Sequence, residues 1–229
     1  MSLVEVAPLT TVFLLSPARC GSLRANQMIE GRMKTPLAEA LRTPSGAPLG
    51  DVFAFLSALY FRGKLAYART FARPPRHLPG VFVITPGAGL VVESTRITGA
   101  HLRAFASVEV HHENAQFAEP LLRDARRLVA EAREDTGFVL LGSIASAKYV
   151  APLAQVFGER LIFPAEFVGR GDMSRGGLLL RAAADQNELE YRTVAGAPLH
   201  GPRSPRLPKR AAKPARADSS AAKPARVKS

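Results

Sequence analysis

The sequence of 229 residues contains a single cysteine and no long apolar run, and each of these features excludes a class of protein. One cysteine, Cys20, excludes an internal disulfide and a zinc site built on cysteines, and it fits a reducing compartment. No apolar run approaches the roughly 20 residues that a membrane-spanning helix needs. Residues 1–5 lack a basic segment before an apolar stretch, so we expect no secretory signal and a cytoplasmic protein without a membrane partner.

Positive charge is unevenly distributed along the chain, whose formal net charge is +12. Residues 196–229 hold nine lysines and arginines against one aspartate, a net of +8, so residues 1–195 carry only +4. The same segment is rich in proline and alanine, a composition that cannot bury enough apolar surface to fold. We predict a disordered basic tail that either contacts nucleic acid in a salt-dependent way or only keeps the protein soluble.

Short apolar runs alternate with amphipathic stretches along residues 1–195. The apolar runs predict buried strands at residues 11–15, 81–85, 138–141 and 160–163. The other stretches predict helices at 23–42, 52–72, 120–133 and 147–157, of which 52–72 is expected to be one long helix. Residues 178–183 and 189–194 are expected to pair as a final hairpin. The pattern predicts an α/β fold: a single domain, 1–195, with a largely parallel central sheet flanked by helices, a C-terminal β-hairpin and the disordered basic tail.

The nine residues from Gly169 to Gly177 combine four glycines with two arginines, a carboxylate and a hydroxyl. They follow a predicted strand, and ligands of open α/β sheets bind where strands end. Glycine allows close approach of the backbone, and the guanidinium groups of Arg170 and Arg175 offer planar forks of donors to a phosphate or carboxylate. The stretch is therefore either an anion-binding loop or a tight turn with solvated arginines.

The long predicted helix has an unusual polar face. Tyr60, Lys64 and Tyr67 are spaced i, i+4, i+7, which places two phenols and an ammonium group on one side. Gly63 lies among them, where a glycine costs about 1 kcal/mol relative to alanine, so we expect something to approach closely there. Phenol rings stack on bases and cations hold phosphates, so this face is a candidate pocket wall.

Four motifs occur in an order that resembles the YaaA family. They are Leu15-Ser16-Pro17-Ala18, Leu56-Ser57-Ala58-Leu59-Tyr60, Ala145-Ser146-Ala147-Lys148-Tyr149 and Arg170-Gly171-Asp172-Met173-Ser174-Arg175. The resemblance implies a cytoplasmic α/β protein linked to peroxide stress, lowered free iron and DNA binding, in a group similar to uracil-DNA-glycosylase-like folds. YaaA-type DNA binding is attributed to a Gly-rich hairpin between two helices. This sequence has no convincing copy of that hairpin, so the basic tail is expected to supply part of the DNA contact.

The motifs and the polar helix face together select the candidate site residues. For catalysis we select Ser16 and Asp172, because a glycosidase-like reaction on a nucleoside needs a carboxylate. The residues expected to bind an anionic ligand are Arg19, Tyr60, Lys64, Lys148, Tyr149, Arg170, Ser174 and Arg175. Two functions remain open: a stress-associated nucleic-acid-binding protein with an anion or nucleotide pocket, and an enzyme acting on a nucleobase, nucleoside or nucleotide. We expect no cofactor for either.

Three other polar groups have both a functional and a structural interpretation. Cys20 is either a nucleophile assisted by Arg19 or a small packed thiol. The His/carboxylate cluster at residues 109–113 would share a strand face at alternate positions, but a metal site needs three or four ligands and nothing selects the rest, so we predict no metal. Glu166 is either a catalytic carboxylate or an ion-pair partner for an arginine.

Overall fold

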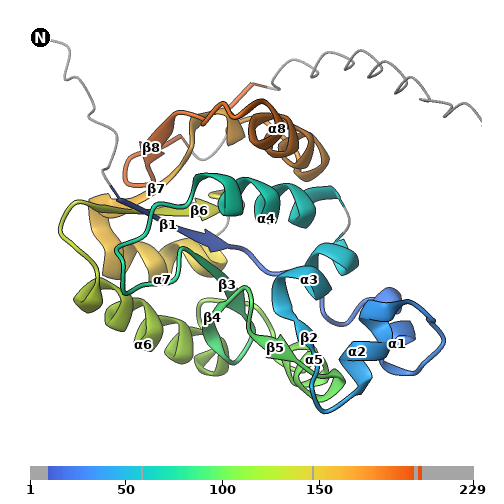
Figure 1. The fold of residues 1–229 in the computed structure, drawn as a ribbon. Helices are drawn as coiled ribbons and strands as arrows, with labels where there is room; N and C mark the ends of the chain where they lie inside the picture. The colour runs from blue at the N-terminus through green and yellow to red at the C-terminus, as the bar shows by residue number, and fades with distance from the viewer. Residues whose placement is uncertain (1–9, 58, 146, 199–200, 203–229) are drawn as a thin grey trace, which may run out of the picture.

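A computed structural model describes residues 10–57, 59–145, 147–198 and 201–202 and has a six-stranded sheet at its centre (Figure 1). The strand order is β4-β3-β1-β6-β7-β8. The four inner strands run parallel: β3 (Val81–Thr85), β1 (Thr10–Leu15), β6 (Thr136–Leu141) and β7 (Leu161–Pro164). The edge strands β4 (Gly89–Val92) and β8 (Tyr191–Thr193) are antiparallel to their neighbours. The predicted α/β fold with a largely parallel sheet is confirmed.

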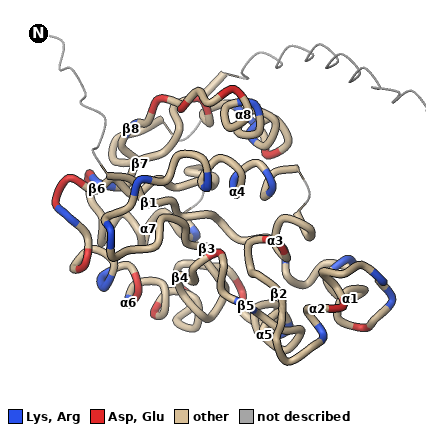
Figure 2. Tube along the Cα trace, in the orientation of Figure 1, with Lys and Arg blue, Asp and Glu red and all other residues tan. Residues whose placement is uncertain are grey.

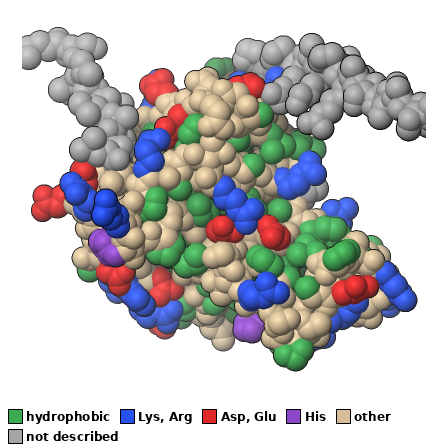
Figure 3. Space-filling view, viewed as in Figure 1, with side chains coloured by type: hydrophobic (Ala, Val, Ile, Leu, Met, Phe, Trp, Pro, Cys, Tyr) green, Lys and Arg blue, Asp and Glu red, His purple; other side chains and the backbone are tan. Residues whose placement is uncertain are grey.

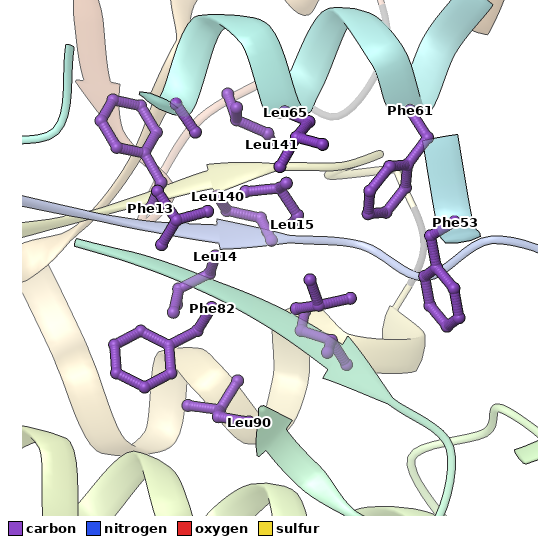
Figure 4. Packing of buried hydrophobic residues seen from close by; sticks show 14 of the residues in the cluster. Phe13, Leu14, Leu15, Phe53, Phe61, Leu65, Phe82, Leu90, Leu140 and Leu141 are labelled. Atoms are coloured by element: carbon purple, nitrogen blue, oxygen red, sulfur yellow. The ribbon is translucent and has the colours of Figure 1, made fainter. Parts of the chain in front are cut away.

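The inner strands are apolar at successive positions because both faces of the sheet are covered. In β1, the side chains from Val12 to Leu15 are fully buried. Side chains of a strand alternate between its faces. Figure 4 accordingly shows Phe13 on the side of α4 and Leu14 on the opposite side, near Phe82 and Leu90. The hydrophobic core thus lies on both faces of β1, which fixes this strand at the centre of the molecule.

Helices form a layer on each face of the sheet (Figure 1). One layer contains α4 (Leu59–Phe71) and α8 (Asp172–Asp185), and the other contains α6 (Ala115–Glu131) and α7 (Ala147–Phe157). The helices α4 and α8 meet backbone to backbone. A Cβ atom built on Gly63 would lie 2.6 Å from the carbonyl oxygen of Gly176, and one built on Gly176 would lie 2.8 Å from the Cα of Tyr60. The close approach predicted at Gly63 is therefore made by α8.

A group of shorter elements lies beyond the carboxyl end of β1 (Figure 1). It consists of α1 (Leu23–Ile29), α2 (Pro36–Arg42), α3 (Leu49–Ser57), α5 (Gly99–Ala106) and a small antiparallel pair of strands, β2 (Ala47–Pro48) with β5 (Arg96–Ile97). Ser22 and Thr35 begin α1 and α2, because their hydroxyl oxygens accept hydrogen bonds from backbone amides in the first turn. Residues 23–42, predicted to form one or two short helices, form two.

Three elements differ from the prediction. The long helix expected at 52–72 is two helices, with the first ending at Ser57. Residues 178–183 are helical rather than extended, because their apolar side chains continue the buried face that begins at Arg175 in α8. The C-terminal antiparallel pair is therefore formed by β7 and β8, which α8 separates in the sequence, with Ile162 opposite Thr193. The helix predicted at 120–133 begins earlier, at Ala115.

Charges of both signs are mixed over the described surface. Figure 2 shows acidic and basic positions close together along α6 and α8, and Figure 3 shows the same mixture on the viewed face. Arg69, for example, contacts Glu93 at 2.6 Å and Asp51 at 3.3 Å. The predicted basic tail lies outside the described residues from position 203 onward. Within the described ranges, no helix combines the length and apolar character needed to cross a bilayer.

Candidate active site

Ser16 and Gly142 lie side by side at the carboxyl edge of the sheet. Ser16 directly follows β1, Gly142 directly follows β6, and the amide of Ser16 donates to the carbonyl oxygen of Leu141 at 3.1 Å. The chain passes from β1 to β3 on one side and later returns to β6 on the other, so the strand order reverses beside β1. Ligands of open α/β sheets bind in the crevice at such a reversal.

Lys64 extends from α4 to this point and binds Ser16 twice. Its Nζ donates to the carbonyl oxygen of Ser16 at 2.7 Å and contacts the Oγ at 2.9 Å. Lys64 is only 1% exposed, and its Nζ lies 4.5 Å from the ring centroid of Tyr60 and 4.8 Å from that of Phe61. Burial lowers the pKa of Lys64 from 10.5 to about 7, while Asp172 raises it and Arg175 lowers it to smaller extents. The amine is therefore present in both protonation states near neutral pH.

Tyr149, in the first turn of α7, contacts the same hydroxyl. Burial raises the pKa of its phenol, and hydrogen bonds with Ser16 and with the backbone of Ser143 act in the opposite direction. Gly142 makes this approach possible. A Cβ atom there would lie 3.0 Å from the Cβ of Ser16 and 3.2 Å from both its Oγ and the Tyr149 ring. The Ser16 hydroxyl thus has an amine and a phenol as its two partners.

The first turn of α8 adds a cation and an anion to the cluster. Arg175 is 8% exposed, and its Nε and Nη2 donate to the carbonyl oxygen of Phe167 at 3.2 and 3.0 Å. Its Nη1 lies 3.6 Å from a carboxylate oxygen of Asp172, which is largely exposed. Burial raises the pKa of the Tyr60 phenol, and the nearby Arg175 opposes this effect. Arg175 is not in hydrogen-bond geometry with this phenol, whose oxygen is buried without a partner.

The structure brings six of the ten predicted site residues into one cluster: Ser16, Tyr60, Lys64, Tyr149, Asp172 and Arg175. Of the other four, Arg19 and Lys148 are exposed. Arg170 donates to the Ser174 hydroxyl at 3.3 Å, and both are half-buried near the start of α8.

The chain matches no protein-family model, no curated protein and no solved structure. The resemblance to YaaA rests on the four sequence motifs. The first three motifs each contribute one side chain to the cluster, Ser16, Tyr60 and Tyr149, and the fourth contributes two, Asp172 and Arg175. Segments that are widely separated in the sequence therefore meet at a single point.

The remaining predicted groups have structural explanations. The stretch 169–177 is a loop only as far as Gly171, and from Asp172 onward it is the first turns of α8. Cys20 is buried, its thiol contacts the carbonyl oxygen of Ala18 at 3.4 Å, and burial raises its pKa to about 12. This thiol is packed and is not activated. Glu166 acts electrostatically on Tyr67 rather than on Lys64.

The His/carboxylate cluster at 109–113 does not lie on a strand, because the chain turns there between α5 and α6. Its alternate residues therefore do not share a sheet face, contrary to the prediction. Among the described residues, no three or more His, Cys, Asp or Glu side chains gather in a way that could hold a metal ion.

A cavity of about 400 Å³ lies away from the cluster, among α1, α2 and α5. Arg42 and Arg103 line it together with Thr43 and Thr98. The guanidinium of Arg42 donates to the carbonyl oxygens of Met28 and Met33. These contacts give Arg42 a structural role in holding α1 against α2.

Sequence reasoning missed the pairing of Lys64 with Ser16. It selected both residues, but it assigned Lys64 to an anionic ligand rather than to a hydroxyl group. A lysine that loses its charge near neutral pH is a proton acceptor, and a hydroxyl within hydrogen-bond reach of such a base can act as a nucleophile. The arrangement can therefore carry out proton transfer at the Ser16 oxygen.

Proposed function

We propose that the protein is an enzyme that acts on a nucleobase, nucleoside or nucleotide, with its reaction centre at Ser16 and Lys64. The observation that carries the proposal is the burial of the Lys64 amine against the Ser16 hydroxyl, at the point where the strand order reverses. Burying an ammonium group opposes folding, and an apolar side chain would fill the same space without this cost. Perturbed groups of this kind are concentrated in functional sites.

The groups around the pair support this class of ligand. Tyr149 is half-buried and offers a phenol ring on which a base can stack. Arg175 adds a buried guanidinium. The helix α8 begins at Gly171 without a side-chain cap, so its first backbone amides are available to an anionic group such as a phosphate.

The proposal is tested by thermal unfolding of the wild type and Arg175→Ala with nucleobases, nucleosides and nucleotides. We expect at least one compound to raise the Tm of the wild type and to lose this effect in Arg175→Ala. Arg126→Ala, which alters an exposed residue of α6, is the matched control and should respond like the wild type. The ligand-induced change in Tm is the readout, because Arg175 also supports the Phe167 carbonyl. A wild type that responds to no compound contradicts the proposal.

Salt-dependent binding of DNA is a second candidate function, favoured by the +8 net charge of residues 196–229. It agrees with the cytoplasmic, stress-associated role that the resemblance to YaaA implies. In a gel-shift assay at low salt, the full chain should retard DNA. A chain with the nine lysines and arginines of 203–229 replaced by glutamine should not. Equal retardation of both chains would assign binding to the folded part, and no retardation of either would rule this function out.

A further inference from the structure

We propose that Ser16 is a nucleophile that accepts an acyl group from an ester or amide, with Lys64 as its general base and Tyr149 as a hydrogen-bond donor. The inference rests on the proposed function only in that the cluster is catalytic. The reacting atom is the Ser16 Oγ, and the bond that breaks is an ester or amide bond rather than a glycosidic bond.

The geometry around the Ser16 oxygen is that of an activated hydroxyl. The Lys64 nitrogen lies 2.9 Å from the Oγ, within the range for direct proton transfer between a nucleophile and its base. A second hydrogen bond, to the Ser16 carbonyl oxygen at 2.7 Å, fixes the direction of the amine. The rings of Tyr60 and Phe61 enclose the nitrogen on its other sides. Pairs of serine and lysine are known variants of the serine–histidine arrangement in acyl transfer.

The backbone around Ser16 holds this geometry in place. The Ser16 amide is hydrogen-bonded to Leu141, so the residue continues the pairing of β1 with β6 by one position beyond the strand. Gly142 lets the Tyr149 ring lie against the same side chain. A hydroxyl on a rigid strand end, with partners from two helices, is preorganised for attack in one direction.

The set of side chains favours acyl transfer over glycosidic cleavage. Most glycosidases place two carboxyl groups about 5 to 9.5 Å apart across the scissile bond. Here Asp172 is the carboxylate that acts on Lys64, Tyr60 and Tyr149, and it is largely exposed beside Arg175. The cluster supplies instead a hydroxyl nucleophile, an amine base and a phenol that can donate to a developing oxyanion.

The reaction balances with water as the only co-reactant. The neutral Lys64 amine takes the Ser16 proton as the Oγ–carbon bond forms and the carbonyl electrons move to oxygen. The oxyanion then collapses, the carbon–heteroatom bond breaks, and the leaving group takes the proton from the Lys64 ammonium. In the second half, Lys64 takes a proton from water as hydroxide adds to the acyl carbon, and it returns that proton to the Oγ as the carboxylic acid leaves.

Two probes test the assignment on the full-length protein. Phenylmethanesulfonyl fluoride labels an activated hydroxyl irreversibly, and the labelled residue is identified by peptide mapping. p-Nitrophenyl acetate reports the rate through the release of p-nitrophenolate and, after acid quench, through the mass of a trapped acetyl group. The variants are Ser16→Ala and Lys64→Met. Their matched controls are Ser107→Ala, at the end of α5, and Lys34→Met, at an exposed position.

We expect the wild type and both controls to carry the label on Ser16. Ser16→Ala should carry no label at this position and should lose the rapid initial release of p-nitrophenolate. Lys64→Met should slow acetylation by about 10²- to 10⁴-fold, the usual contribution of a general base. The wild-type rate should rise with pH through about 7, where Lys64 loses its proton, and this step should be absent from the residual rate of Lys64→Met.

Several results would overturn the assignment: no label on the wild type, a label on Lys64 instead of Ser16, an unchanged rate in Ser16→Ala, or a Lys64→Met rate equal to that of the wild type. If Ser16→Ala does not unfold cooperatively, the peptide map of the wild type decides alone. Stabilisation by a nucleotide without an acyl-enzyme would remove this inference and leave the proposed function standing. Acylation of Ser16 without stabilisation by any nucleobase, nucleoside or nucleotide would remove the proposed function and leave this inference standing.

Discussion

Replacing Lys64 with methionine should change how the stability of the protein depends on pH. The pKa of Lys64 falls from 10.5 in the unfolded chain to about 7 in the folded protein. At about 1.4 kcal/mol for each tenfold change in proton concentration, this corresponds to about 5 kcal/mol of unfavourable free energy below pH 7. Because the folded protein holds this proton less tightly than the unfolded chain, folding releases it between pH 7 and 10.5.

This proton release sets the direction in which the free energy of unfolding changes with pH. The wild type gains stability as the pH rises from 7 to 10.5, and Lys64→Met lacks this contribution. The advantage of the variant over the wild type should therefore be largest near pH 7 and should shrink by about 2 to 3 kcal/mol between about pH 7.5 and 9.5. The variant also leaves the buried Ser16 carbonyl without its donor, at a cost of about 1–3 kcal/mol that does not vary with pH.

Urea unfolding across this pH range measures the difference directly. Subtracting the wild-type curve from the variant curve removes the titration of groups that the two proteins share. Lys34→Met should run parallel to the wild type, because Lys34 is exposed. Parallel curves for Lys64→Met and the wild type would refute the description of Lys64 as a buried, easily deprotonated amine.

Three further substitutions probe the packing around the cluster. Gly176→Ala should lower the free energy of unfolding by about 1–3 kcal/mol, because its Cβ would meet the α4 backbone at 2.8 Å. Gly142→Ala should slow acetylation of Ser16 more than it destabilises the fold, because the new methyl group would press on the Ser16 side chain. Tyr191→Phe should lower the free energy of unfolding by about 1 kcal/mol in urea, because its hydroxyl bonds to Tyr67 at 2.8 Å.

Each substitution has an outcome that would count against its reasoning. Gly171→Ser is the matched control for Gly176→Ala, because the space around Gly171 is open and a serine there can cap α8, so it should be neutral or slightly stabilising. A stable Gly176→Ala protein would mean that the two helices can move apart. Unchanged acetylation in Gly142→Ala would separate this glycine from the reaction centre. An unaffected Tyr191→Phe protein would make its hydrogen bond dispensable.

The strands could be predicted from the sequence because the inner strands are covered on both faces. β1, β3 and β6 therefore appear as continuous apolar runs between turn residues. Residues 178–183 also form an apolar run, but they are helical and not a strand. A run of a few leucines and alanines suits a strand and a buried helix equally well, and only the preceding turn, from Asp172, makes it helical.

The chemistry of the cluster was harder to predict because it depends on how deeply each side chain is buried. Tyr60, Lys64 and Tyr67 lie on one helix face, as their spacing predicts, yet they serve two different places. Tyr67 is about 4.5 Å further along the helix axis than Lys64 and bonds to Tyr191 instead of contacting Ser16. Periodicity indicates which face is buried, but it does not indicate which buried group loses its charge.

The backbone contact between Gly63 and Gly176 also determines when the site comes into existence. It joins a helix from the first third of the chain to the last helix that the structure describes. As a nascent chain emerges, α4 with Lys64 is made long before α8, and until α8 packs against α4 the lysine lacks part of its cover, so we expect it to be more basic than in the folded protein. The neutral amine is thus a property of the finished molecule, and an incomplete chain would carry the same serine and lysine without the reactivity that their pairing gives.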